Sequence, residues 1–273
     1  MEQFVPFLPG ILFPAPSSSY DESCMFLKWI SLDTNANNSD PARDIPVIHI
    51  TPEEMPCENY ILYSHGNGTD IGGVLDLLTF LSRELHANVI AYEYPAYGIR
   101  QKRQPHENPS SSTMLTECEA VGRFVVEKLQ VPLDKIVVMG RSIGTGPACH
   151  LARYLEINYH QQCRGVVLMS AYTSIRDVAR GLLPFGIGWL CPLIFDNMSN
   201  VTALHSPLCF IHGQLDCIIP ASHSVTLYHS NTRSVNTLHL IDVGTHNDFS
   251  LTDDFVEPVK AFLHSTLSVF ENT

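Results

Sequence analysis

Apolar residues form two patterns along this chain, short continuous runs and longer stretches in which they recur every three or four residues. The short runs predict β-strands, and these lie at Cys24–Leu32, Val47–Thr51, Tyr60–Ser64, Asn88–Tyr94, Lys135–Met139, Arg164–Met169, Pro207–His212 and Thr237–Val243. The amphipathic stretches predict helices, and these lie at Asp70–Leu85, Thr113–Gln130, Gly144–Ile157, Ser222–His229 and Phe255–Leu267. From about Tyr60 onward strands alternate with helices, which indicates βαβ units and a parallel sheet.

The first two strands follow one another without a helix, and the polar loop 33–43 between them predicts an antiparallel hairpin. Runs such as Ile136–Met139 are apolar throughout, which is typical of parallel strands covered on both faces. We therefore expect an α/β protein with the layout of the α/β-hydrolase fold, an eight-stranded, mostly parallel sheet with helices on both faces. A nucleotide-binding doubly wound fold is disfavoured, because the glycines at Gly66 and Gly68 lack the third glycine of its fingerprint.

A chain of 273 residues is long enough for one large domain. We expect residues 1–20 to form an apolar, proline-rich N-terminal segment and residues 21–273 to form the α/β domain, with a lid-like insert at about 173–200. The apolar stretches Phe4–Pro16 and Gly181–Phe195 contain prolines and are shorter than the roughly 20 residues of a membrane-spanning helix, so neither should cross a bilayer. Phe4–Pro16 is expected to pack on the body of the protein, with weak membrane association as the alternative.

The charge balance excludes some classes of partner. Sixteen Lys and Arg residues stand against 28 Asp and Glu, a net charge of −12, which argues against nucleic acid and against a basic patch that docks on anionic lipid.

The eight cysteines form no C-x-x-C pair, and no H-E-x-x-H occurs, so we expect reduced thiols, no metal and no cofactor. The N-terminus lacks the features of a secretory signal, so we expect a cytoplasmic protein. Arg100, Lys102 and Arg103 predict a solvated basic loop.

A G-x-S-x-G motif follows the apolar strand that ends at Met139. This motif places a nucleophilic serine on a sharp strand-to-helix turn, where the residues two positions away on either side must be small. Gly140 and Gly144 meet that need around Ser142, and small residues follow at the start of the next helix. We therefore expect Ser142 to be a nucleophile.

An activated serine needs a base and an acid that orients the base, and this fold places them in the chain order Ser, acid, His. Asp216 comes just after the strand Pro207–His212, and His246 comes just after the strand Thr237–Val243. Because both follow strand ends, we expect Ser142, Asp216 and His246 to form a catalytic triad. Asp248 is an alternative acid, ranked lower because it lies only two residues from the histidine.

The oxyanion of an acyl-transfer reaction needs backbone N–H donors. One donor is expected from Ile143, directly after the serine, and a second from the loop after the strand Tyr60–Ser64. In that loop Asn67 is the preferred donor and Gly68 is the next candidate, because the flanking glycines allow the backbone amides to turn inward.

Five segments together resemble the α/β-hydrolase domain-containing protein 17 family, over nearly the whole chain. These segments are Leu62–Asn67, Tyr94–Gly98, Gly140–Pro147, His212–Asp216 and His246–Asp248. The resemblance implies a membrane-associated serine hydrolase that removes palmitoyl groups from protein cysteines. Three features differ from that family. The first 23 residues contain no cysteine, and Arg141 stands where the family more often has glutamine, as in the related Bem46-like hydrolases. The segment Gly181–Asn200, expected over the mouth of the active site, is also unusually apolar.

The function predicted from the triad and the resemblance is hydrolysis of an acyl ester or thioester, with a palmitoyl-protein thioesterase as the first choice. A lipid esterase or general carboxylesterase is the alternative, and a non-catalytic binding protein on the same fold ranks below both. The substrate would be an acylated protein or a lipid, with peripheral contact to a membrane. Leu182, Phe185 and Trp189 are expected to shape an acyl groove, although a helix that buries this face on the sheet explains them equally well.

Overall fold

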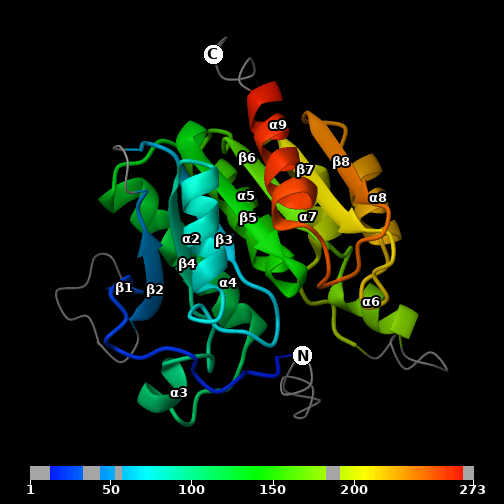
Figure 1. Ribbon diagram of the computed structural model, residues 1–273. Helices are drawn as coiled ribbons and strands as arrows, with labels where there is room; N and C mark the ends of the chain where they lie inside the picture. The colour runs from blue at the N-terminus through cyan, green and yellow to red at the C-terminus, as the bar shows by residue number, and fades with distance from the viewer. Residues whose placement is uncertain (1–12, 33–43, 53–56, 183–190, 267–273) are drawn as a thin grey trace. The chain divides into compact units, whose positions relative to one another are not determined.

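The computed structural model describes residues 13–32, 44–52, 57–182 and 191–266. The predicted acyl-groove residues Phe185 and Trp189 lie outside these ranges. The chain divides into two compact units, Met1–Pro132 and Leu133–Thr273, and each is described by itself. All eight predicted strands are present in the described ranges, four in each unit (Figure 1).

The first unit contains a four-stranded sheet with the strand order β1-β2-β4-β3. The bounds of these strands are Leu27–Ile30 for β1, Ile45–Ile50 for β2, Tyr60–Ser64 for β3 and Asn88–Tyr92 for β4. Strands β1 and β2 pair antiparallel, as do β2 and β4, whereas β3 and β4 run parallel. The predicted antiparallel start of the chain is therefore confirmed.

The helices of the first unit differ from the predictions mainly at their ends. They are α2 (Leu75–Glu84), α3 (Arg100–Arg103) and α4 (Ser111–Arg123), and a π-helical turn (Phe124–Lys128) continues α4. Helix α2 begins at Leu75 and not at the predicted Asp70. Asp70 is buried, and its carboxylate accepts hydrogen bonds from the N–H groups of Ser19 (2.7 Å) and Gly73 (2.8 Å). These bonds hold residues 70–73 in a loop and delay the helix.

The prediction of a loop at Arg100, Lys102 and Arg103 is wrong, because all three belong to helix α3, and the predicted solvent exposure holds for Lys102 and Arg103 but not for Arg100. Arg100 belongs to α3 and is buried. Its guanidinium pairs with the carboxylates of Glu107 and, at 2.7 Å, Glu117. A buried cation needs such partners because it has lost its water, and the two glutamates lie too far along the chain for local patterning to reveal them.

The second unit contains four parallel strands in the order β5-β6-β7-β8. Their bounds are Ile136–Arg141 for β5, Gly165–Met169 for β6, Leu208–Gly213 for β7 and Asn236–Ile241 for β8. Strands β6 and β7 are buried along their whole length, and β5 is buried up to its last residue. The carboxyl ends of parallel strands meet at one edge, so the residues that follow β5, β7 and β8 are brought to the same side of this sheet.

Helices cover the strands of the second unit. They are α5 (Thr145–Tyr159), α6 (Ile175–Leu182), α7 (Asn197–Ala203), α8 (Ser222–Ser230) and α9 (Glu257–Ser265). Figure 1 shows α9 in front of these strands and α8 behind them. Helix α9 approaches β6 closely, since a Cβ atom added to Gly165 would lie 2.7 Å from the Phe262 ring. The predicted insert at about 173–200 contains α6 and α7, and its action as a lid remains a prediction.

Three further observations concern the described residues alone. None of their helices has both the length and the apolar character needed to cross a membrane. All eight cysteines fall within the described ranges, and each is a free thiol. No group of three His, Cys, Asp or Glu side chains is placed there to hold a metal ion.

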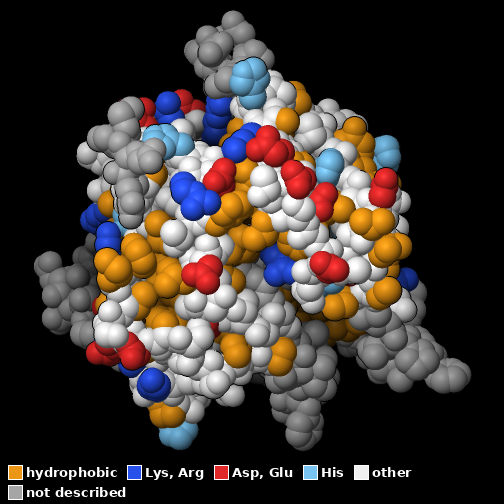
Figure 2. All heavy atoms as spheres, viewed as in Figure 1, with side chains coloured by type: hydrophobic (Ala, Val, Ile, Leu, Met, Phe, Trp, Pro, Cys, Tyr) orange, Lys and Arg blue, Asp and Glu red, His pale blue; other side chains and the backbone are white. Residues whose placement is uncertain are grey.

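Figure 2 shows apolar side chains across the face that it presents, with charged groups scattered among them.

Candidate active site

The turn after β5 holds Ser142 in a strained backbone conformation. Ser142 has a φ of +54°, in the left-handed region that non-glycine residues rarely adopt, and it begins a short 3₁₀ turn that leads into α5. Gly140 faces this turn at very close range, since a Cβ atom at position 140 would lie 2.5 Å from the Gly144 carbonyl oxygen and 2.7 Å from the Ala148 Cβ. Such strain is typical of a serine that a sharp turn presents for reaction.

Three side chains predicted from the sequence meet at this edge of the sheet. The Nε2 atom of His246 lies 3.0 Å from the Oγ of Ser142. The Nδ1 atom of the same ring lies 2.6 Å from an Asp216 carboxylate oxygen. A serine hydroxyl, an imidazole and a carboxylate in this sequence of contacts can move the serine proton to the imidazole while the carboxylate orients the ring.

The Asp216 carboxylate is buried and satisfied on both oxygens. Oδ1 accepts hydrogen bonds from the N–H groups of Ile218 and Ile219, both at 2.8 Å, and Oδ2 faces His246. Burial alone would raise the pKa of Asp216, but hydrogen bonds from His212, His246 and the Ile219 N–H outweigh it and hold the pKa well below the usual range. Asp216 is therefore ionised at neutral pH and can stabilise an imidazolium on His246.

The loops after β7 and β8 are packed backbone against backbone, which sets the distance between acid and base. The Leu215 N–H donates to the Gly244 carbonyl at 2.9 Å. A Cβ atom at Gly213 would contact the carbonyl group of Gly244, so only glycine fits at this approach. Asp216 comes directly after Leu215, and His246 comes two residues after Gly244.

Asp248, the alternative acid, has a different role in the structure. It is exposed, and its backbone closes a turn with Thr245: the Thr245 N–H donates to the Asp248 carbonyl at 3.0 Å, and the Asp248 N–H donates to the Thr245 hydroxyl at 3.0 Å. Asp216 occupies the position beside the His246 ring.

Two residues contact the triad in ways that sequence reasoning did not predict. Arg141 directly precedes the serine, and its Nη2 donates to the His246 carbonyl (2.9 Å) and to the Asn247 side-chain oxygen (2.8 Å). His212 is fully buried, and its Nε2 lies 3.3 Å from the Asp216 oxygen that faces His246. In the sequence His212 begins the segment His212–Asp216, four residues before the acid, and neither that segment nor the spacing indicates a contact between the two side chains.

The expected oxyanion donors belong to different units. In the second unit, Ile143 is buried just inside the helical turn, and its carbonyl accepts a hydrogen bond from the Tyr172 hydroxyl at 2.9 Å. In the first unit, Asn67 and Gly68 are exposed after β3, and the Gly68 N–H donates to the Asn67 side-chain oxygen at 3.1 Å. The Tyr97 hydroxyl donates to that same oxygen at 2.7 Å.

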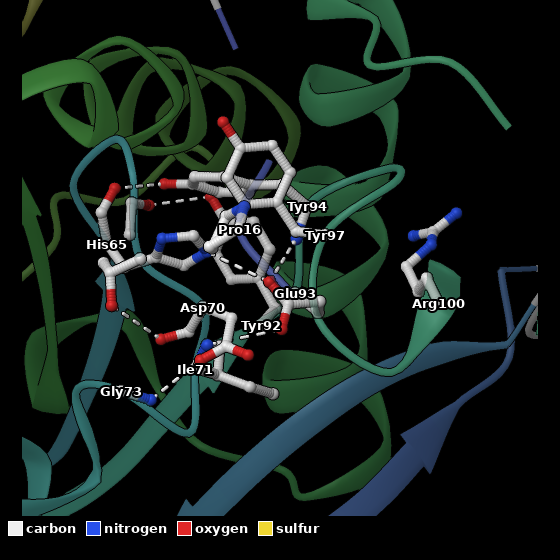
Figure 3. A network of polar contacts seen from close by, with 12 residues as sticks. Pro16, His65, Asp70, Ile71, Gly73, Tyr92, Glu93, Tyr94, Tyr97 and Arg100 are labelled. Atoms are coloured by element: carbon white, nitrogen blue, oxygen red, sulfur yellow. Dashed lines mark hydrogen bonds and ion pairs between the residues drawn. The ribbon is translucent and has the colours of Figure 1, made fainter. Parts of the chain in front are cut away.

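Buried aromatic and acidic side chains surround His65 and Asp70, at the two ends of the loop 65–70 (Figure 3). The rings of His65 and Tyr94 are stacked with centroids 3.8 Å apart, and the Tyr94 hydroxyl donates to the His65 carbonyl at 2.7 Å. Glu93 is fully buried, lies 3.3 Å from His65 Nε2 and accepts a hydrogen bond from the Tyr20 hydroxyl at 2.9 Å. These contacts limit the conformations open to residues 65–70.

The predicted acyl groove can be placed only in part. Leu182 is the last residue of α6, and Phe185 and Trp189 lie outside the described residues. The groove therefore stays a prediction. Other apolar side chains near the triad are exposed, and they are Leu215, Ile218 and Val243, on the loops that carry Asp216 and His246.

Comparison with known proteins supports the resemblance noted in the sequence motifs. The chain is 29% identical over 207 residues to α/β-hydrolase domain-containing protein 17C of Xenopus tropicalis, covering 76% of this chain and 62% of that protein. It is 29% identical over 213 residues to the human protein of the same name, covering 78% of this chain and 60% of that protein. The resemblance is therefore confirmed, and the chain spans about three fifths of the length of these relatives. No model of a protein family matches the chain.

Solved structures with the same architecture include esterases and peptidases. An esterase of Pyrococcus furiosus matches with a TM-score of 0.64 at 14% identity, covering 93% of this chain and 96% of that chain. Acetyl xylan esterase 1 from Thermoanaerobacterium sp. matches with a TM-score of 0.60 at 15% identity, covering 92% and 86%. The predicted α/β-hydrolase fold is thus confirmed.

Proposed function

We propose that this protein is a serine hydrolase that cleaves acyl esters or thioesters, with Ser142 as nucleophile, His246 as general base and Asp216 as the acid that orients the base. One observation carries this proposal: the unbroken line of contacts from Asp216 through His246 to the Ser142 hydroxyl, at 2.6 Å and 3.0 Å. The three residues come from separate loops, so a purely structural role for the whole arrangement is a poor explanation.

The reaction follows from this geometry. His246 Nε2 takes the Ser142 proton as Oγ attacks the acyl carbonyl, and the resulting imidazolium gives that proton to the departing alcohol or thiol. Water then attacks the acyl-serine while His246 again takes a proton, and collapse of the second intermediate releases the carboxylic acid and returns the proton to Ser142. Asp216 stays ionised throughout and keeps the Nδ1 proton of His246 directed toward itself.

The oxyanion of both tetrahedral intermediates needs two donors, and we assign them to the N–H groups of Ile143 and Asn67. Ile143 is supported by its position directly after the nucleophile at the start of a helix, where the backbone N–H groups point outward. Asn67 rests on the sequence pattern alone, a position between two glycines shortly after the strand Tyr60–Ser64. Loss of one such donor typically costs about 3 kcal/mol of transition-state stabilisation.

For the substrate we propose a palmitoylated protein, so that the bond cleaved is a cysteine thioester. The similarity to the α/β-hydrolase domain-containing protein 17 relatives supports this choice. The exposed apolar side chains of Leu215 and Val243, on the loops that carry Asp216 and His246, also support it. An acyl chain of this length needs apolar surface beside the nucleophile. The predicted groove at Leu182, Phe185 and Trp189 would supply more of it.

A lipid or general carboxylesterase is the second candidate, and the specific observation in its favour is the likeness to esterase structures. It uses the same three side chains and the same steps. The two candidates differ only in the leaving group and in the length of the acyl chain that the protein accepts.

Matched substrates separate the candidates. An S-palmitoyl cysteine peptide, the same peptide with O-palmitoyl serine, a monoacylglycerol and p-nitrophenyl esters from C4 to C16 would be compared for wild type and Ser142→Ala. The proposal predicts turnover that disappears in Ser142→Ala, a preference for the thioester peptide and rates that rise with chain length. Preference for monoacylglycerol, or equal rates across the ester series, would replace the thioesterase by the esterase. No Ser142-dependent turnover of any substrate would refute the hydrolase.

A further inference from the structure

The Asp216 carboxylate holds two imidazole rings. The same oxygen, Oδ2, lies 2.6 Å from His246 Nδ1 and 3.3 Å from His212 Nε2. The side chains of Asp216 and His212 are completely buried, whereas that of His246 is 12% exposed. A second ring on the catalytic carboxylate has no part in the reaction sequence given above.

The partners of the His212 ring determine its tautomer. Nε2 faces two groups that can only accept, the Ile219 carbonyl at 2.8 Å and the ionised Asp216 carboxylate. Nε2 therefore carries a proton. Nδ1 lies 2.7 Å from the Ser224 hydroxyl, which can donate to it.

We propose that His212 is a positioning residue for the catalytic acid: its Nε2–H, shared between Asp216 and the Ile219 carbonyl, orients the carboxylate toward His246 and disperses part of its charge. This inference rests on the proposed function, in which Asp216 orients the base.

The line of contacts is thereby extended beyond the three catalytic side chains. It runs from Ser142 through His246, Asp216 and His212 to Ser224, which sits in helix α8. Ser224 is buried, and its hydroxyl also lies 3.5 Å from the Ala171 carbonyl. The acid is thus held against helix α8 by side-chain hydrogen bonds as well as by the backbone of its own loop.

The charged and titratable groups around this pair come from several elements. Asp216 and His246 approach from the loops after β7 and β8, and Arg141 contacts the His246 backbone from β5. His223 in α8 has its pKa lowered by burial, and the nearby His212 lowers it further while Asp177 in α6 raises it. The Thr173 hydroxyl lies between these two side chains, 2.9 Å from an Asp177 carboxylate oxygen and 3.0 Å from His223 Nδ1.

Loss of the His212 donor should alter the pH dependence of the reaction. A carboxylate that loses a hydrogen bond carries more concentrated charge and stabilises a neighbouring imidazolium more strongly. The acid limb of the kcat/KM profile, where the rate falls toward low pH, would then move to higher pH. A residue that merely fills space in the core would lower stability without moving this limb.

Two polar substitutions provide a matched test. Gln at position 212 places an amide N–H near the original Nε2, whereas Asn places it near Nδ1, where it cannot reach Asp216. We expect His212→Asn to lower kcat/KM about tenfold, the effect of losing one hydrogen bond to a charged group. The same variant should shift the acid limb of the kcat/KM profile to higher pH by about half a unit. His212→Gln should stay within about threefold of wild type, with the acid limb unmoved.

Equal behaviour of the Asn and Gln variants, or an unmoved acid limb in His212→Asn, would overturn the proposal. If these variants fail to fold, ¹⁵N NMR of the histidine rings in the wild-type protein remains decisive. A protonated His212 Nε2 supports the proposal, and a Nδ1–H tautomer with unprotonated Nε2 refutes it. The NMR result does not require turnover, so failure of this inference can be distinguished from failure of the proposed function, which would appear as inactive wild-type protein.

Discussion

The guanidinium of Arg141 donates to the backbone carbonyl of His246 at 2.9 Å, so the residue before the proposed nucleophile holds the loop of the proposed base. The same Nη2 atom donates to the Asn247 side-chain oxygen at 2.8 Å, and the centroid of the Phe249 ring lies 5.7 Å from the guanidinium carbon. The end of β5 and the loop after β8 are thereby joined by a side chain as well as by the Ser142–His246 contact.

Arg141→Gln should misplace the base without removing any reacting group. We expect kcat to fall by about tenfold to a hundredfold and KM to stay near the wild-type value, because a charge-assisted hydrogen bond is worth roughly 1.5–3 kcal/mol. Steady-state kinetics on one ester substrate measures both constants. Asn247→Ala, which removes only one of the two acceptors, is the matched control and should lose less. A rise in KM with kcat unchanged would instead assign Arg141 to substrate binding.

Gly140→Ala tests the close packing beneath the serine. The added methyl would lie 2.5 Å from the Gly144 carbonyl oxygen, and neither backbone can retreat. We expect a loss of about 2–3 kcal/mol in the free energy of unfolding and a large fall in activity, measured by urea unfolding and ester turnover. Gly181→Ala is the control, because a Cβ atom there meets nothing within 4 Å. Similar results for the two variants would contradict the packing argument.

Tyr97→Phe tests the support of the Asn67 loop. Removal of the hydroxyl frees the Asn67 side-chain oxygen from its 2.7 Å contact, so kcat should fall about threefold to tenfold, the value of one neutral hydrogen bond. In a double-mutant cycle the same change should have no further effect once Asn67→Ala is present. Tyr60→Phe, at the other end of β3, is the control and should retain wild-type activity. If the effects of Tyr97→Phe and Asn67→Ala are additive, Tyr97 does not act through the Asn67 loop.

His49 should make stability depend on pH. Burial, followed by the positive charge of Lys28, lowers the pKa of His49 to about 4. The unfolded chain binds this proton near pH 6.5 and the folded chain only near pH 4, so the stability contribution is present above pH 6.5 and is lost as the pH falls toward 4. Because His49 is partly exposed, we expect a loss of only about 1–2 kcal/mol.

Urea unfolding between pH 7 and pH 4.5 measures this loss. His49→Gln should show a flatter dependence than wild type, whereas His106→Gln, at an exposed position, should keep the wild-type slope. If the free energy of unfolding depends on pH equally in wild type and His49→Gln, His49 is not the cause of the dependence.

The sequence predicted the strands, the antiparallel start and the three side chains of the site because each leaves a local signal. A continuous apolar run marks a buried strand, and the residue after its end must lie at the edge of the sheet. Ser142, Asp216 and His246 could be found in this way. The turn at Ser142 also has a signal of its own, in the glycines at 140 and 144.

The features that were missed depend on contacts between distant parts of the chain. Helix α2 starts late because Ser19 binds Asp70, a partner 51 residues away. Arg100 is buried because two glutamates neutralise it, which its basic neighbours gave no reason to expect. Arg141 reaches a backbone carbonyl 105 residues further along the chain, and no pattern of residue types specifies such a bond.

The most direct test of the central claim is to map the site at which a fluorophosphonate modifies the protein. Wild type, Ser142→Ala and His246→Gln would be treated at neutral pH, digested and analysed by mass spectrometry. We expect a single adduct on Ser142 in wild type, none in Ser142→Ala and strongly slowed labelling in His246→Gln. An adduct on a different serine, or a folded wild-type protein that does not react, would contradict the proposed triad.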